Sequence, residues 1–168
     1  ADTVQLAKVA IAGSVDGLDT ITGFNIATDV IRTLDTAYAI FNGATDGTVV
    51  LGTGATLDAV HDAGANATAI TLSGNVATHT FVTFLAGGSN IAQLEGAIGT
   101  AVGAATDAKW ANTDKVIVAI DDGTHTGIVL VESAASSNAI AVAELSVLGI
   151  IVGLADATTL GAANFAFS

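Results

Sequence analysis

KVIVAIDDGTHTGIVLVE, the sequence of residues 115–132, decides the class of fold because a turn signal separates two aliphatic runs. The runs, Lys115–Ile120 and Gly127–Glu132, are rich in Val and Ile, whose branched side chains favour pleated strands. Between them, Gly123 follows two aspartates and can supply the positive φ angle that a tight turn requires. The stretch therefore predicts an antiparallel hairpin.

Strand-like segments recur on both sides of this hairpin, separated by Gly, Asn and Asp. The predicted strands are residues 3–11, 19–24, 29–34, 37–41, 48–51, 67–72, 76–85 and 144–154. A short helix is predicted at Leu57–Asp62, and the tail is Leu160–Ser168. The strands predict a mainly β fold, arranged as a β-sandwich or a β-roll-like stack.

One segment, residues 89–106, has the spacing of a helix instead. Ser89 can cap its start, and Ile91, Leu94, Ile98 and Val102 then recur on one helical stripe. Two glycines inside this stripe cost roughly 1 kcal/mol each relative to alanine, so tertiary packing must hold the helix.

The chain is predicted to be a single β-rich domain over residues 1–168. A soft boundary near residues 87–88 would separate a strand-rich part, residues 1–86, from a part with the helix, the hairpin and the tail, residues 89–168.

The composition excludes several classes of function. The 168 residues carry 16 acidic against 4 basic side chains, a net charge of -12, so the chain is not expected to bind nucleic acid or an anionic membrane. There is no cysteine, which excludes disulfides and thiolate sites. The longest apolar run, residues 139–154, is short and contains Glu144, so membrane insertion is not expected. Few lysines and much Ala, Thr, Gly, Val and Asp favour an extracellular or cell-surface location.

Two stretches carry a resemblance to a known family. Residues 16–31 read DGLDTITGFNIATDVI, and the run from Ser89 onward ends in TLGAANFAFS. Together they resemble the C-terminal domains of type I-secreted (RTX, haemolysin-type) exoproteins and of bacterial surface-layer proteins. The resemblance implies closure of a calcium-binding β-roll, an export signal in the tail and the type I secretion machinery as a partner. The glycine-rich nonapeptide array of that family is absent, and Gly23 stands where many relatives have Asp.

Five aspartates are the candidate metal ligands, with calcium as the possible cofactor. The resemblance implies that Asp16 and Asp19 could bind calcium. Calcium needs six to eight oxygen ligands, which is more than two residues supply. Asp29 could join them if the strands fold back. The alternative is that Asp16 and Asp19 are turn-formers that bond their own backbone. Asp121 and Asp122 are weaker candidates, since the hairpin turn by itself explains them.

The motifs of common enzymes are missing, so the chain is predicted not to be an enzyme. His61, His79 and His125 are isolated from one another, which does not fit a zinc site, and there is no G-x-S-x-G segment.

The leading hypothesis for function is structural. The apolar run Val147–Leu154 is either buried on both faces or paired with another subunit, and the tail Asn164–Phe167 could dock on a neighbour as an added strand. We therefore expect an extracellular protein that assembles with itself into a surface layer or filament, with possible help from calcium. The alternative is a C-terminal calcium-binding and secretion-targeting module of a larger exoprotein or adhesin. A third hypothesis is a small secreted hydrolase or ligand carrier.

Overall fold

The computed structural model describes residues 1–6, 18–33, 59–62, 68–72, 80–102, 115–132 and 141–167. The strands are β1 (Thr3–Leu6), β2 (Asp19–Ile21), β3 (Val30–Thr33), β4 (Ala59–Asp62), β5 (Thr68–Leu72), β6 (Lys115–Asp121), β7 (Thr126–Glu132), β8 (Leu145–Ile151) and β9 (Phe165–Phe167). The helices are α1 (Thr80–Leu85) and α2 (Ile91–Val102), with short 3₁₀ turns η1 (Val142–Glu144), η2 (Ala157–Thr159) and η3 (Ala162–Asn164).

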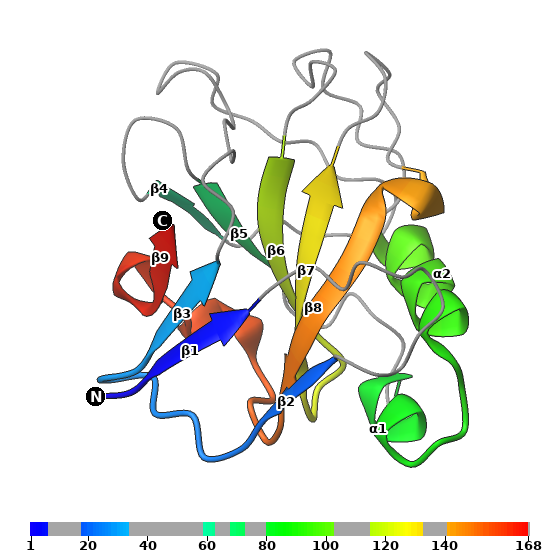
Figure 1. The fold of residues 1–168 in the computed structure, drawn as a ribbon, viewed down its shortest axis with the longest axis horizontal. Helices are drawn as coiled ribbons and strands as arrows, with labels where there is room; N and C mark the ends of the chain where they lie inside the picture. The colour runs from blue at the N-terminus through cyan, green and yellow to red at the C-terminus, as the bar shows by residue number, and fades with distance from the viewer. Residues whose placement is uncertain are drawn as a thin grey trace.

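The described strands form two sheets, which Figure 1 shows with the helices to one side. The larger sheet has the strand order β2-β8-β7-β6-β5-β4, and the smaller has the order β1-β3-β9. This is a mixed α/β arrangement with substantial strand content. The structure therefore confirms that the fold is rich in strands. The two strands predicted at residues 37–41 and 48–51 lie outside the described residues.

The predicted hairpin is confirmed and forms the centre of the larger sheet. β6 and β7 pair antiparallel, from Lys115 opposite Glu132 to Asp121 opposite Thr126. Gly123 has a φ of 79°, as the turn between two such strands requires.

The predicted helix over residues 89–106 is present as α2, with a different cap. Asn90 Oδ1 accepts a hydrogen bond from the Gln93 N–H at 2.9 Å, and Gln93 Oε1 accepts one from the Asn90 N–H at 2.9 Å. This reciprocal pair is a capping box, so Asn90 caps the helix, and the assignment of that role to Ser89 was wrong by one position. No helix among the described residues is long and apolar enough to cross a membrane.

Two other predictions of local structure are wrong. Residues 76–85 were predicted as a strand, but Thr80–Leu85 form α1. Residues 57–62 were predicted as a helix, but Ala59–Asp62 form β4, which pairs antiparallel with β5. The soft boundary near residues 87–88 falls in the connection between α1 and α2 and stays a prediction.

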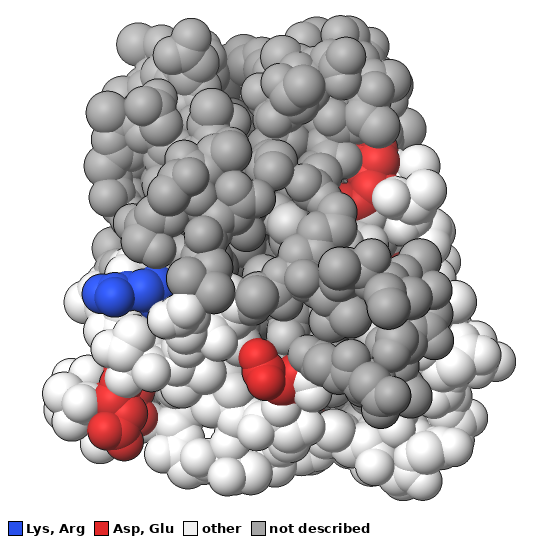
Figure 2. Space-filling model, in the orientation of Figure 1, with Lys and Arg blue, Asp and Glu red and all other residues white. Residues whose placement is uncertain are grey.

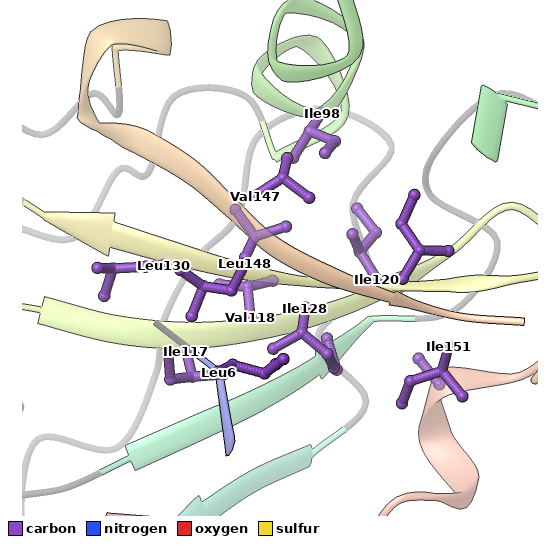
Figure 3. Close-up of a cluster of buried hydrophobic side chains, with 14 of the residues drawn as sticks. Leu6, Ile98, Ile117, Val118, Ile120, Ile128, Leu130, Val147, Leu148 and Ile151 are labelled. Atoms are coloured by element: carbon purple, nitrogen blue, oxygen red, sulfur yellow. The ribbon is translucent and has the colours of Figure 1, made fainter. Parts of the chain in front are cut away.

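The core lies on both faces of the larger sheet. On one face the helices pack closely: a Cβ at Gly127 of β7 would lie 2.5 Å from the Phe81 ring of α1. On the other face Leu6 of β1 lies over Gly149 of β8, where a Cβ would meet its Cδ2 atom at 3.2 Å. Figure 3 shows the same division, with Ile98 of α2 beside Val147 and Leu6 beside Ile117.

The apolar strand β8 is buried on both faces within one chain. Val147–Ile151 are all buried, between β2 and β7. The sequence left two explanations open for this apolar run, burial on both faces or pairing with another subunit. Burial on both faces within the chain explains residues 147–151. The tail residues Phe165–Phe167 pair in parallel with β3 of their own chain, and docking of the tail on a neighbour stays a prediction.

The two sheets are connected twice in the same manner. β2 in the larger sheet leads to β3 in the smaller, and β8 leads likewise to β9. β2 lies parallel beside β8, and β3 parallel beside β9, so these two strand–turn–strand units stack as layers. β1 then adds to the side of β3 away from β9.

Candidate functional site

The densest polar cluster among the described residues lies at the turn between β6 and β7. Asp121 and Asp122 are both only 2% exposed, although acidic side chains are rarely buried so deeply without partners. The hairpin places them there because Asp121 ends β6 and Asp122 begins the turn.

Asp122 joins the turn to the start of α1. Its Oδ2 atom accepts hydrogen bonds from the N–H groups of Phe81 at 2.8 Å and Val82 at 3.4 Å. Its Oδ1 atom accepts from the N–H groups of Thr124 at 3.0 Å and His125 at 2.8 Å. Asp122 therefore caps α1, whose Phe81 lies 41 residues before it, and also shapes its own turn.

Asp121 and its neighbours join the turn to the loop that follows β8. Asp121 Oδ2 accepts from the Ala157 N–H at 2.9 Å, and its Oδ1 accepts from the Gly123 N–H at 3.0 Å. Thr126 Oγ1 donates to the Leu154 carbonyl at 2.7 Å. The side chains of the turn thus connect three separate segments of the chain.

This geometry explains the buried carboxylates by backbone chemistry. Each oxygen of Asp121 and Asp122 accepts at least one backbone N–H, which offsets the cost of burying the group. That is the turn role which the sequence favoured for these two residues over metal binding. Within the described ranges, no group of three or more His, Cys, Asp or Glu side chains is placed to hold a metal ion.

Asp29, a predicted calcium ligand, is 6% exposed and fastens the N-terminus to the β2–β3 turn. Its Oδ2 accepts from the Asn25 N–H at 2.9 Å, and its Oδ1 accepts from the Asp2 N–H and the Thr28 hydroxyl, both at 2.9 Å. The Asn25 and Asp2 N–H bonds lower the pKa of Asp29 below its ordinary 3.8, because they stabilise the carboxylate.

Two further residues were predicted to bind calcium together with Asp29. Asp19 is exposed at the start of β2, and Asp16 lies outside the described residues. Of the three histidines, His79 also lies outside them, and His61 is in β4 opposite Ala69. His125 is in the turn beside Asp122.

Asn164 is a structural residue that the sequence analysis did not single out as one. It is 5% exposed, and its Nδ2 atom donates to the carbonyls of Ile26 at 2.8 Å and Asp29 at 2.9 Å. Its Oδ1 accepts from the Gly161 N–H at 2.9 Å. Asn164 thereby fixes the tail on the β2–β3 turn, and the only sequence signal was its place before Phe165 in the tail.

Comparisons of the chain with protein-family models, with curated proteins and with solved structures find no match.

Proposed function

We propose that the chain is an extracellular structural protein that assembles with itself into a surface layer or filament. The assembly would proceed by strand pairing at one end of the stack of layers. The finer fold that we propose is a β-roll-like stack, in which β2–β3 and β8–β9 are two layers and β1 begins a third.

The observation that supports this proposal most is an open end of the stack. No described strand pairs with the outer side of β1 or of β2, each of which is one of the two edge strands of its sheet. The Asp2 carbonyl accepts from the Val30 N–H at 2.9 Å, so the backbone groups of Asp2 point to β3. Because these groups alternate along a strand, those of Thr3 and Gln5 point to the open side.

β2 offers a second set of backbone groups at the same end. The Ile21 carbonyl accepts from the Val152 N–H at 2.8 Å and so faces β8. The N–H and C=O of Thr20 consequently point away from β8. Edge groups that pair with no described strand are a possible template for another chain.

The side chains at this end do little to block pairing. Natural edges are commonly protected by Lys or Pro, and β1 and β2, with sequences TVQL and DTI, contain neither. On the side of the molecule that Figure 2 shows, the surface of the described residues is mostly uncharged, and the acidic side chains are scattered rather than clustered. The exposed Asp19 is the one acid within these two strands, and calcium would assist assembly by neutralising acids such as this.

The alternative, a C-terminal calcium-binding and secretion-targeting module of a larger exoprotein, uses the same open end. A preceding strand–turn–strand unit of that larger protein would then stack on β1 and β2 in place of a second copy. A gene with a repeat-rich or catalytic region before Ala1 would favour this alternative. A secreted hydrolase or ligand carrier is the third candidate, and it requires a deep pocket that gathers His and Asp.

Negative-stain electron microscopy with millimolar calcium tests the proposal. We expect ordered sheets or filaments from the wild-type chain. Gln5→Pro should abolish them, because proline removes an outward N–H while the bonds between β1 and β3 remain. Gln5→Thr is the matched control, since it keeps the N–H and should assemble normally. Monodisperse monomers of the wild-type chain would contradict self-assembly and favour the targeting module.

A further inference from the structure

The imidazole of His125 makes one hydrogen bond that depends on its protonation state. Its Nδ1 atom accepts from the Gly153 N–H at 2.9 Å, across 28 residues of sequence. A ring nitrogen can accept only when it carries no proton, so this contact requires neutral imidazole with its proton on Nε2. A doubly protonated ring would place N–H against N–H.

We propose that His125 is an acid-sensitive latch between the hairpin turn and the loop that follows β8. When the imidazole is neutral, it holds the Gly153 N–H and the latch is closed. When the imidazole takes up a proton, this bond is lost and the start of the loop is released. The proposal concerns the folded chain alone and does not depend on self-assembly.

Loss of the bond to His125 would affect the start of the loop, because Gly153 lies shortly after β8. It has a φ of 83°, a conformation that glycine adopts readily, and it turns the chain out of β8 toward η2 and β9. The Gly153–Ala157 loop is also held to the hairpin turn by the hydrogen bonds from Thr126 Oγ1 to the Leu154 carbonyl and from the Ala157 N–H to Asp121. Neither bond uses the imidazole, so protonation of His125 loosens one end of the loop selectively.

The two described segments that the latch joins, residues 121–126 and 152–160, contain three acidic residues and no lysine or arginine. These are Asp121 and Asp122 on the turn and Asp156 in the loop. α1 has no acidic residue in its first turn and no basic residue in its last. The carboxylates of Asp122 and Asp156 each accept backbone N–H groups, and these hydrogen bonds fix the positions of both side chains. The carboxylates attract an imidazolium, but they cannot restore the bond to Gly153, because that bond needs an unprotonated Nδ1.

Amide exchange measured by NMR tests the latch. The ring ¹⁵N signals of His125 would be followed across its titration, together with the exchange of the Gly153 amide corrected for intrinsic rate. We expect the Nε2–H tautomer in the neutral state and about a fivefold to tenfold loss of Gly153 protection on protonation. The Ala157 amide, bound to Asp121, should keep its protection over the same interval.

Two variants make the test specific. His125→Asn places an acceptor oxygen near the Nδ1 position without a titratable ring, so Gly153 should stay protected at both extremes of the titration. His125→Phe has no acceptor, so Gly153 should be unprotected throughout. A pH dependence that persists in His125→Asn would assign the effect to His61 or His79 and overturn the proposal. Equal protection in His125→Phe and the wild-type chain would overturn it as well.

Discussion

Asp29 and Asn164 show how single polar residues hold this chain together over long separations. Asp29 reaches back to the Asp2 N–H, and Asn164 reaches the Asp29 carbonyl from 135 residues away. Both side chains are almost fully buried, and each polar atom of either side chain has a partner. Buried groups satisfied in this way fix the relative position of segments, because removing one partner leaves the other unpaired.

The Asp29 carboxylate predicts a loss of stability in acid. Its pKa is lowered in the folded chain, so folding favours the ionised form. The stabilisation is fully present above the ordinary pKa of about 4 and is lost as the pH falls through the lowered value. We expect the free energy of unfolding, measured by urea titration, to fall between pH 5 and pH 3.

Asp29→Asn is the variant that isolates this contribution. Its amide cannot ionise, so it should be less stable than the wild-type chain at pH 6 and should lose less stability on going to pH 3. Asp19→Asn, at an exposed position, should follow the wild-type profile. If Asp29→Asn and the wild-type chain lost the same stability in acid, the assignment to Asp29 would be wrong.

The sequence could predict the roles of these residues only where the partner is close in the chain. Asp121 and Asp122 stand before Gly123, so their turn chemistry was visible, and the structure has it. Asp29 was predicted as a metal ligand by the family resemblance, and no local pattern indicates its bond to the Asp2 N–H, 27 residues away. Asn164 was missed as a structural residue for the same reason.

At the scale of elements, α1 is the clearest case of a structure set from a distance. Its six residues, TFVTFL, are too few for a stable isolated helix and contain two threonines, which favour strands. Asp122 caps its first turn, and Phe81 packs on Gly127 of β7. The strand prediction for residues 76–85 used local preference alone, and tertiary contacts reverse that preference.

The elements that sequence did predict carry their signal within themselves. The hairpin has its turn residues between two strands, and α2 has an apolar stripe from Ile91 to Ile98 that is buried as predicted. Residues 59–62 lack such a signal, and their pairing with β5 makes them a strand.

The two glycines of α2 form a matched pair for testing how this helix packs. A Cβ at Gly96 would meet no atom of the described residues within 4 Å, so Gly96→Ala should stabilise the fold by up to about 1 kcal/mol through helix propensity. A Cβ at Gly99 would lie 2.9 Å from Val142 Cγ2 and 3.3 Å from Leu145 Cδ1. Gly99→Ala gains the same propensity but must push these side chains away.

Thermal or urea unfolding of both variants measures the difference. We expect Gly96→Ala to be more stable than the wild-type chain and Gly99→Ala to be less stable than Gly96→Ala by about 1–3 kcal/mol. Equal stabilisation by both substitutions would mean that α2 does not approach η1 and β8 as closely as described.

At the scale of the whole molecule, the β2–β3 and β8–β9 units contain a repeat that the sequence analysis did not find. Ile21-Thr22-Gly23-Phe24 and Ile151-Val152-Gly153-Leu154 share the order isoleucine, any residue, glycine, large apolar residue. The two isoleucines are register partners in neighbouring strands, and both glycines have positive φ. Four positions separated by 130 residues are too weak a pattern to notice, and it becomes visible only when the strands are paired.

The charge of the whole chain sets the conditions for the proposed assembly. Copies that each carry a net charge of -12 repel one another, and Asp19 of each copy lies in an edge strand at the open end. Monovalent salt reduces this repulsion by screening, whereas calcium can also bind carboxylates directly. We therefore expect light scattering to report more assembly in millimolar calcium than in sodium chloride of the same ionic strength. The difference between the two salts should be smaller for Asp19→Asn, because this variant lacks the one carboxylate within β1 and β2. Equal assembly of the wild-type chain in the two salts would mean that calcium acts only by screening charge. Assembly would then depend on strand pairing without direct binding of calcium to carboxylates.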